Sequence, residues 1–362
     1  ILQNDKKSAE GWFLSGLVEK VSGRNNPARS AFSKALRYDL RRYDAAVELA
    51  ELNAQALQHR EALDLLQKYE SALANSPKYL DRAARIYSRL GLHARAWPLY
   101  SRACKLQPSA DSLTANLAAN SVLVGKIDLA QSLYRQLLQR HPGHQRNHYE
   151  LSRLERARDR SHVDQMLELL RSTQLPPARN IFLYYAIAKE LEDLNDLPGA
   201  FDFYKRGGDA ASSVARDAGY RVSDDIEVID RMIEVCDSNW LQDGREARVQ
   251  GAADKSPIFV VGLPRTGTTL TERIIASHSQ VESADETFFM QLAIRHVSGL
   301  AVKEDITPDM VSAAAGTDMQ QLADHYLQAV DYRLGDQPMF IDKYPFNFLY
   351  LGFIAKAFPH AR

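Results

Sequence analysis

Apolar positions in the first two hundred residues follow a helical spacing that repeats every 34 residues. Two fixed positions of the repeat hold small residues, and a large apolar residue follows the second of them. Small residues let two helices approach closely, and a large residue fills the groove between them. The pattern therefore predicts a succession of antiparallel helix pairs. The three series are Gly16, Ala50, Ala84, Ala118, Ser152 and Ala186; Ala28, Ala62, Ala96 and Ala130; and Phe32, Leu66, Tyr100 and Tyr134.

Proline keeps the same step at Pro108, Pro142 and Pro176, where it would stop the second helix of a pair. A 34-residue unit with these features resembles the tetratricopeptide repeat (TPR). Asp164 disturbs the fifth unit, and in the sixth we expect Ala200 and Tyr204 to take the small and large roles two residues late. We place about six units, at residues 9–42, 43–76, 77–110, 111–144, 145–178 and 179–212.

The TPR solenoid is predicted for residues 1–212, and residues 213–256 are predicted to hold a capping helix and a linker. Gly207 and Gly208 are expected to end the repeats. Ser223 is expected to cap a helix that packs the solenoid against the next domain. Solenoids of this kind bind a peptide or protein on their concave face, and we expect such a partner here. A role in scaffolding or dimerising the following domain fits the repeats equally well.

The hydrophobic pattern changes after residue 256. Residues 258–261 form a short, β-branched apolar run that predicts a buried strand. A loop bounded by Gly262 and Gly267 follows, and then apolar residues return at a helical spacing from Leu270. Strand, loop and helix start in this order predict a phosphate-binding loop, because the loop N–H groups and the helix N-terminus both attract an anion.

Composition and charge give no support for a nucleic-acid-binding, disulfide-rich or membrane-spanning protein. The net charge of −1 gives no global basic field for nucleic acid, and the hydrophobic fraction of 45% is ordinary for a globular protein. Cys104 and Cys236 lie far apart in helical patterns and predict free thiols. No apolar run approaches the roughly 18 residues of a membrane helix. We expect a cytoplasmic protein, although the chain starts at Ile1 and a removed signal or anchor stays open.

The loop sequence PRTGTTL at residues 264–270 resembles the 5′-phosphosulfate loop of sulfotransferases. These enzymes use 3′-phosphoadenosine 5′-phosphosulfate (PAPS), and Arg265 makes the loop most similar to the tyrosylprotein sulfotransferase branch. The resemblance implies a multidomain α + α/β protein, with the TPR solenoid followed by a P-loop-type parallel-sheet domain that begins at residue 257. It also implies that the chain stops at Arg362 before the 3′-phosphate subsite, so we expect this piece alone to be inactive.

Arg265, Thr266, Gly267, Thr268 and Thr269 would bind the PAPS or PAP phosphates, if the resemblance holds. Thr268 stands where a nucleotide-hydrolysing P-loop carries lysine. That replacement, and the lack of an obvious Mg²⁺-binding acidic strand, disfavour a nucleotide kinase or NTPase. Arg265 is the cation of the loop, and it would stabilise charge on the departing phosphate.

Glu286, about twenty residues after the loop, has two readings. The resemblance implies that it is the catalytic base for an acceptor hydroxyl. Its spacing from Ser283 also fits a capping box that opens the next helix. The role of the neighbouring Asp285 stays open, at a position where the relatives often have Gly or Glu.

Lys343 follows a second predicted strand at Phe340 and Ile341. In the resemblance it is the cation that contacts the transferring sulfonate and the leaving phosphate, and Asn347 would help to orient the loop. A surface lysine at a strand end is the alternative. Functional residues gather at the carboxyl ends of parallel strands, which favours the first reading.

Taken with the resemblance, these residues predict in-line transfer of a sulfonate from PAPS to a hydroxyl, with no metal. The acceptor would be a protein tyrosine or another small or polymeric alcohol. The rival hypothesis is a TPR adaptor with a non-catalytic nucleotide loop. Among the histidines, His141, His144 and His148 lack a carboxylate or thiol at metal-ligand spacing, so no metal site is predicted there.

Overall fold

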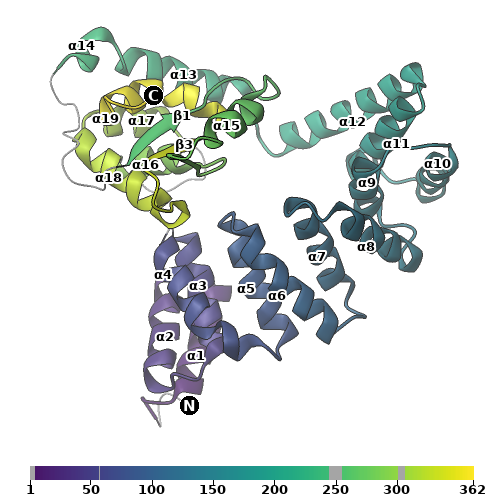
Figure 1. Cartoon of the computed structure of the whole chain (residues 1–362), viewed down its shortest axis with the longest axis horizontal. Coiled ribbons are helices and arrows are strands. Elements are labelled where there is room, and N and C mark those ends of the chain that lie inside the picture. Colours follow the sequence, from purple (N-terminus) through teal and green to yellow (C-terminus); the bar gives the residue numbers. More distant parts are fainter. Residues whose placement is uncertain (1–4, 57, 244–254, 301–305) are drawn as a thin grey trace. The chain divides into compact units, whose positions relative to one another are not determined.

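The computed structural model describes residues 5–56, 58–243, 255–300 and 306–362. The described chain divides into two compact units, Ile1–Gly219 and Tyr220–Arg362 (Figure 1). Each unit has its own hydrophobic core. The first unit is built from helices, and the second from helices and strands. The predicted order of an α-helical solenoid followed by an α/β domain is confirmed.

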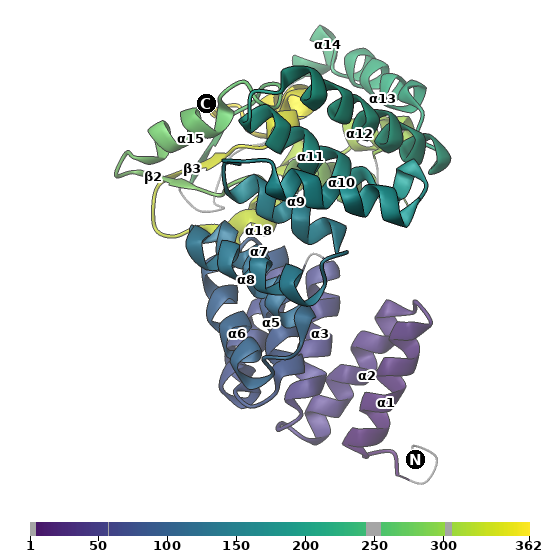
Figure 2. The same cartoon turned by 90° about the vertical axis from the view of Figure 1, so that its right-hand side faces the viewer.

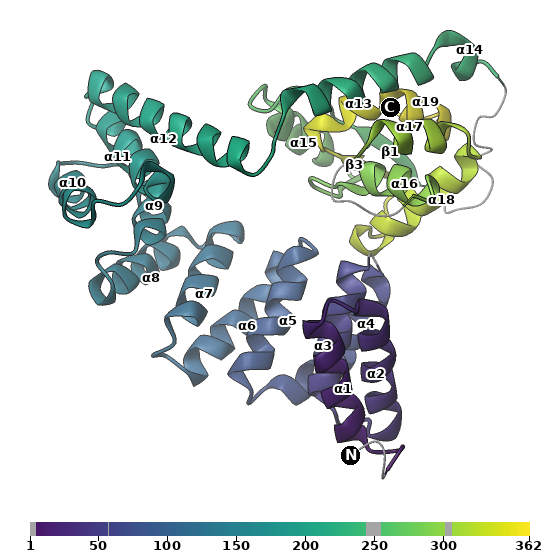
Figure 3. The ribbon, with the colours of Figure 1, turned by 180° about the vertical axis from the view of Figure 1, so that it is seen from behind.

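Six helix pairs make up the described part of the N-terminal unit, and they follow one another in chain order (Figure 3). Short 3₁₀ turns at Glu70–Leu73 and Pro177–Arg179 join some of them. The first helices of the pairs are α1 (Ala9–Val21), α3 (Tyr43–Gln55), α5 (Pro77–Arg89), α7 (Asp111–Leu123), α9 (Gln145–Leu154) and α11 (Ile181–Asp193). The second helices are α2 (Asn25–Tyr38), α4 (His59–Tyr69), α6 (His93–Leu106), α8 (Ile127–Arg140), α10 (Ser161–Thr173) and α12 (Leu197–Asp217).

The repeated small residues lie where the helices meet. Ala28, Ala62, Ala96 and Ala130 are fully buried, and the large residues that follow them are buried too. At Gly16, an added Cβ would come within 2.5 Å of the Phe32 ring, so only glycine allows this approach. Close packing between the paired helices is thus the physical basis of the 34-residue period.

The sixth pair departs from the prediction at two points. Helix α12 continues through Gly207 and Gly208 to Asp217, past the expected end at residue 212. A Cβ at Gly207 would meet the Tyr185 ring at 3.1 Å, so close packing outweighs the low helix propensity of glycine. Tyr204 is 36% exposed, and the neighbouring Phe203 packs against the core instead.

Three short parallel strands form the sheet of the C-terminal unit, in the order β1-β3-β2. The first strand begins two residues before its predicted start. Arg362 adds to the outer edge of β1, since its N–H donates to Pro257 O and its carbonyl accepts from Phe259 N. The strands are β1 (Ser256–Phe259), β2 (Val281–Ser283) and β3 (Met339–Asp342).

Helices cover this sheet and enclose a core that includes Phe340 of β3. The first of them starts at Val222 without a side-chain cap from Ser223, and it packs within this unit against the helix Pro308–Ala315. In the described residues, no helix is both long and apolar enough to span a membrane. The helices are α13 (Val222–Val235), α14 (Ser238–Leu241), α15 (Thr268–Ala276), α16 (Phe289–Val297), α17 (Pro308–Ala315), α18 (Met319–Val330) and α19 (Leu351–Ala357), with 3₁₀ turns at Asp331–Arg333 and Pro345–Tyr350.

Candidate active site

The predicted phosphate loop connects β1 to the N-terminus of α15. Gly262 and Gly267 have φ angles of 152° and 96°, which glycine adopts without steric cost. The N–H of Gly262 donates to Pro345 O and that of Val260 to Asp342 O, so the loop begins against the end of β3. The first N–H groups of α15 have no partner within the helix, and they form the positive end of its dipole.

Arg265 lies at the tip of this loop with a φ of 71°, in the left-handed region. Its side chain is exposed, and among the described residues it makes no ion pair. The hydroxyl of Thr266 donates to Leu263 O at 2.7 Å and closes the turn. The loop thus presents a cation, backbone donors and the hydroxyls of Thr268 and Thr269 on one short segment.

Glu286 and Lys343 meet at the carboxyl ends of β2 and β3, which lie side by side (Figure 2). The Lys343 ammonium donates to Glu286 Oε1, and the Lys343 N–H donates to Asp285 O at 3.2 Å. Lys343 is only 5% exposed, so the reading as a surface lysine is wrong. The Glu286 side chain is 57% exposed, which leaves one end of the pair open to an incoming molecule.

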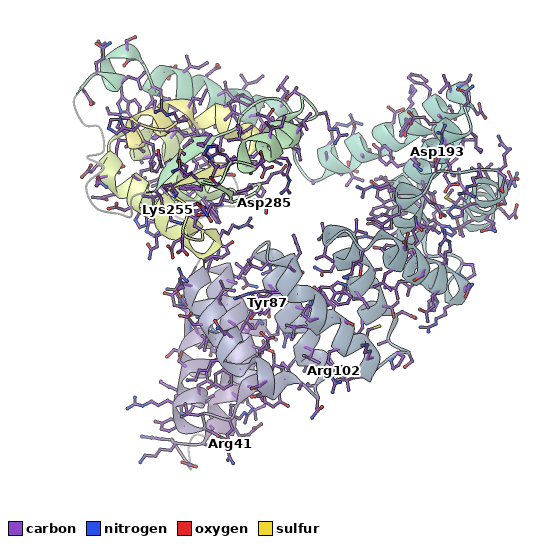
Figure 4. The ribbon with its side chains drawn as sticks, viewed as in Figure 1. Arg41, Tyr87, Arg102, Asp193, Lys255 and Asp285 are labelled. Atoms are coloured by element: carbon purple, nitrogen blue, oxygen red, sulfur yellow. The ribbon has the colours of Figure 1, made fainter. Side chains whose placement is uncertain are left out.

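The capping box at Ser283 and Glu286 does not form. Helix α16 begins at Phe289, and no side chain caps it. Ser283 instead accepts the N–H of Asp285 at 2.9 Å and donates its hydroxyl to Glu272. Asp285, labelled in Figure 4, has a φ of 59°, a conformation that aspartate tolerates and glycine prefers.

Asp342 links the segment that carries Glu286 to the end of β3, which carries Lys343. It is fully buried, and it accepts hydrogen bonds from the hydroxyls of Thr287 at 2.7 Å and Tyr326 at 2.9 Å. Thr287 follows Glu286 and Asp342 precedes Lys343, so this bond holds the two site residues together. Burial raises the pKa of Asp342 from its ordinary 3.8 to about 6, against the lowering effect of these hydrogen bonds.

Sequence reasoning missed Glu272, in the second turn of α15. The residue is 1% exposed, whereas Leu270 and Ile274, two apolar residues at a helical spacing, are 67% and 63% exposed. Glu272 Oε2 lies 3.8 Å from the Lys343 ammonium. A polar residue facing inward from a helix is not visible in the spacing of apolar residues, so the pattern held no signal for it.

Asn347 is fully buried in the 3₁₀ turn Pro345–Tyr350. The contact from this turn to the loop is made by the backbone carbonyl of Pro345, which accepts from Gly262. A role for the Asn347 side chain in orienting the loop therefore stays a prediction.

The solenoid holds a separate buried network at its histidines. His148 Nδ1 lies 2.8 Å from His162 Nε2, and His162 Nδ1 lies 2.6 Å from Glu190 Oε1. His148 Nε2 donates to Pro142 O at 2.7 Å. Of the other histidines considered, His141 contacts Asp111 and His144 caps α9. Burial lowers the pKa of His148 below its ordinary value of 6.5.

Residues 257–362 match the model of the sulfotransferase family. An uncharacterized protein of Aquifex aeolicus (strain VF5) is 31% identical over 205 residues, which is 55% of this chain and 26% of that protein. The chain thus spans about a quarter of the length of this curated relative.

Solved structures similar to this chain include the TPR protein YrrB, described as having an unusual peptide-binding site, with 16% identity and a TM-score of 0.40. That match covers 56% of this chain and 95% of YrrB. Pseudomonas aeruginosa pilF shares 16% identity at a TM-score of 0.43, covering 59% of this chain and 93% of its own. Assignment of the solenoid rests on its own helix pairs and buried small residues.

Proposed function

We propose that the protein transfers the sulfonate of PAPS to an acceptor hydroxyl, a proposal supported by the match of residues 257–362 to the sulfotransferase family model. The observation that supports this most directly is the contact between Lys343 and the half-open Glu286, beside the start of the phosphate loop. It joins a buried cation, which suits an anionic leaving group, to a carboxylate that can accept a proton. The acceptor is a tyrosine side chain or another small or polymeric alcohol.

The residues fit the donor. PAPS supplies a sulfonate on a phosphate leaving group, and the backbone N–H groups of residues 266–269 with the hydroxyls of Thr268 and Thr269 would hold its oxygens. Arg265 and Lys343 would stabilise the negative charge that grows on the leaving phosphate. No metal is required by this assignment.

Glu286 would take the acceptor proton. The acceptor oxygen forms a bond to sulfur while the bond from sulfur to the phosphate oxygen breaks. The proton goes to the Glu286 carboxylate, and PAP leaves with the electron pair of the broken bond. A base that is partly exposed and hydrogen-bonded to a lysine stays within reach of both acceptor and solvent.

The experiment is calorimetric titration of the whole protein with PAP and with ATP–Mg²⁺, followed by a transfer assay with labelled PAPS. We expect saturable binding of PAP and none of ATP–Mg²⁺. Arg265→Ala and Lys343→Ala are expected to lower turnover more than PAP affinity, because their charges oppose one that grows in the transition state. Binding of ATP–Mg²⁺ alone would indicate an NTPase, and binding of neither nucleotide would indicate an adaptor.

For the solenoid, we propose a binding surface for a peptide or protein partner. A hollow of about 300 Å³ lies between the first helices of two neighbouring pairs, α5 and α7. Lys78, Arg82 and Arg85 line it with Asp81. Arg82 pairs with Glu48 and Arg85 with Asp81, so Lys78 is the cation that would attract an acidic residue of the partner. Peptide-array binding to the whole protein, with and without Lys78→Glu, tests this assignment.

A further inference from the structure

Glu272 is a buried carboxylate in a place where burial is costly. It is 1% exposed, on a helix whose apolar residues Leu270 and Ile274 face outward. Removing an ionised carboxylate from water costs several kcal/mol unless a charge and hydrogen bonds compensate. The contacts of this side chain therefore indicate why it is there.

Two contacts offset the cost of burying the Glu272 carboxylate. The Ser283 hydroxyl donates to Oε1, and the Lys343 ammonium lies 3.8 Å from Oε2. Ser283 in turn accepts the Asp285 N–H at 2.9 Å. The carboxylate thus connects α15, which carries the phosphate loop at its N-terminus, to the ends of β2 and β3, which carry Glu286 and Lys343.

The two carboxylates around Lys343 differ in their freedom. The Glu286 side chain is 57% exposed, whereas the Glu272 side chain is 1% exposed and held by Ser283. Glu286 can therefore turn toward another molecule, and Glu272 cannot follow it.

We propose that Glu272 is a positioning residue that acts through Lys343, an inference that rests on the proposed sulfonate transfer. When Glu286 leaves the ammonium to accept a proton from the acceptor, Lys343 would otherwise remain as a buried cation with no counter-ion. Glu272 supplies the permanent counter-ion and keeps the ammonium between α15 and the ends of β2 and β3. Lys343 can then exchange Glu286 for the donor oxygens without losing its charge or its position.

The test is Glu272→Gln in the whole protein. Among the described residues, Lys343 then pairs with Glu286 alone, so the base stays occupied and turnover falls at least ten-fold. PAP affinity changes by no more than about two-fold, because both cations and the loop N–H groups remain. Glu272→Asp, which keeps the charge, is expected to recover at least a third of the turnover.

The matched control is Glu282→Gln on β2, whose carboxylate pairs with Lys255 away from Lys343. It removes a similar ion pair from the same unit, and its turnover is expected to stay within about two-fold. Parallel losses of turnover and PAP affinity in Glu272→Gln, with equal losses in the control, would show a purely structural role. Unchanged turnover would also overturn the proposal. If Glu272→Gln does not fold, Ser283→Ala removes the donor to Glu272 and must give the same separation of turnover from affinity.

A second readout does not need sulfonate transfer. Acetylation of Lys343 by acetic anhydride, followed on its own peptide by mass spectrometry, is expected to accelerate at least five-fold in Glu272→Gln. An amine held by one carboxylate is less restrained than one held by two. An unchanged rate would refute the positioning role even in an active enzyme. Acceleration in a protein that transfers no sulfonate would refute the proposed function and leave the contact between Glu272 and Lys343 established.

Discussion

The two units each bury charged side chains, but they end their networks differently. In the solenoid, the chain of contacts from Glu190 through His162 and His148 ends on a backbone carbonyl, and Glu190 and His148 are 2% and 3% exposed. At the site, the contacts from Glu272 through Lys343 end on Glu286, whose side chain is 57% exposed. The first network ends on the backbone within its own unit, whereas the second ends on a carboxylate that solvent reaches.

The solenoid network is continuous from the carboxylate to the backbone. His148 Nε2 donates to Pro142 O, the two rings contact each other, and His162 Nδ1 contacts Glu190 Oε1. Each ring therefore has a partner at both of its nitrogens.

We expect the largest effect from a substitution at Glu286, the exposed end of the network at the site. Glu286→Gln keeps the shape of the side chain and removes its basicity, so we expect turnover to fall by about 10² to 10⁴. The melting temperature of the whole protein should change little, because the residue is half exposed and caps no helix. Steady-state kinetics and calorimetry measure the two quantities.

Asp285→Asn is the control for that substitution, since this neighbouring carboxylate pairs only loosely with Arg273, at 3.7 Å. We expect near-normal turnover. If Asp285→Asn loses activity and Glu286→Gln retains it, the base is Asp285.

We expect a smaller effect from a substitution in the solenoid network of Glu190, His162 and His148. Glu190→Gln keeps the volume but removes the carboxylate charge, so the buried contact with His162 Nδ1 is weakened. We expect the free energy of unfolding of the N-terminal unit to fall by roughly 1–3 kcal/mol. PAP binding by the whole protein should not change. Urea denaturation, followed by pulsed hydrogen exchange on peptides of that unit, measures it.

Glu168→Gln on α10 provides the matched control. It removes the same charge from an exposed pair with Arg171, whose side chains are 69% and 72% exposed. Exposed pairs contribute little to stability, so little change is expected. Equal losses in the two variants would mean that the buried network has no special role.

The last prediction concerns pH, where the stabilities of the two units should respond in opposite directions. Asp342 has a folded pKa of about 6, above its ordinary 3.8, so its contribution to stability is present below about pH 3.8 and lost as pH rises through 6. The loss amounts to about 1–3 kcal/mol. His148 has a lowered pKa, so its contribution is present above pH 6.5 and lost as pH falls.

Asp342→Asn should remove the pH dependence of the C-terminal unit between pH 4 and 7, and leave that of the solenoid unchanged. Urea denaturation at several pH values, followed on peptides of each unit, gives both curves. Asp324→Asn, an exposed aspartate on α18, should keep the dependence. A stability that rises with pH in the C-terminal unit would contradict the assignment to Asp342.

The backbone of the site was accessible from sequence because it depends on local pattern. Glycines at two positions of positive φ, a short apolar strand and a helix start define the loop without knowledge of distant contacts. The helix pairs were accessible for the same reason, since a 34-residue period records which residues must be small. The predictions that Tyr204 is the buried large residue and that the last repeat ends at residue 212 were wrong. The reason is that the last repeat has no following repeat to constrain its pattern.

The amino-acid sequence by itself determined the two kinds of architecture, the phosphate loop, and Lys343 and Glu286 as site candidates. Tertiary structure alone decided that Glu286 faces Lys343 instead of capping α16, and that Glu272 and Asp342 are buried beside them. The physical reason is that local spacing sets which backbone forms. The partner of a charged side chain is set by strands that are far apart in the chain, here β2 and β3, which are joined only when the parallel sheet forms.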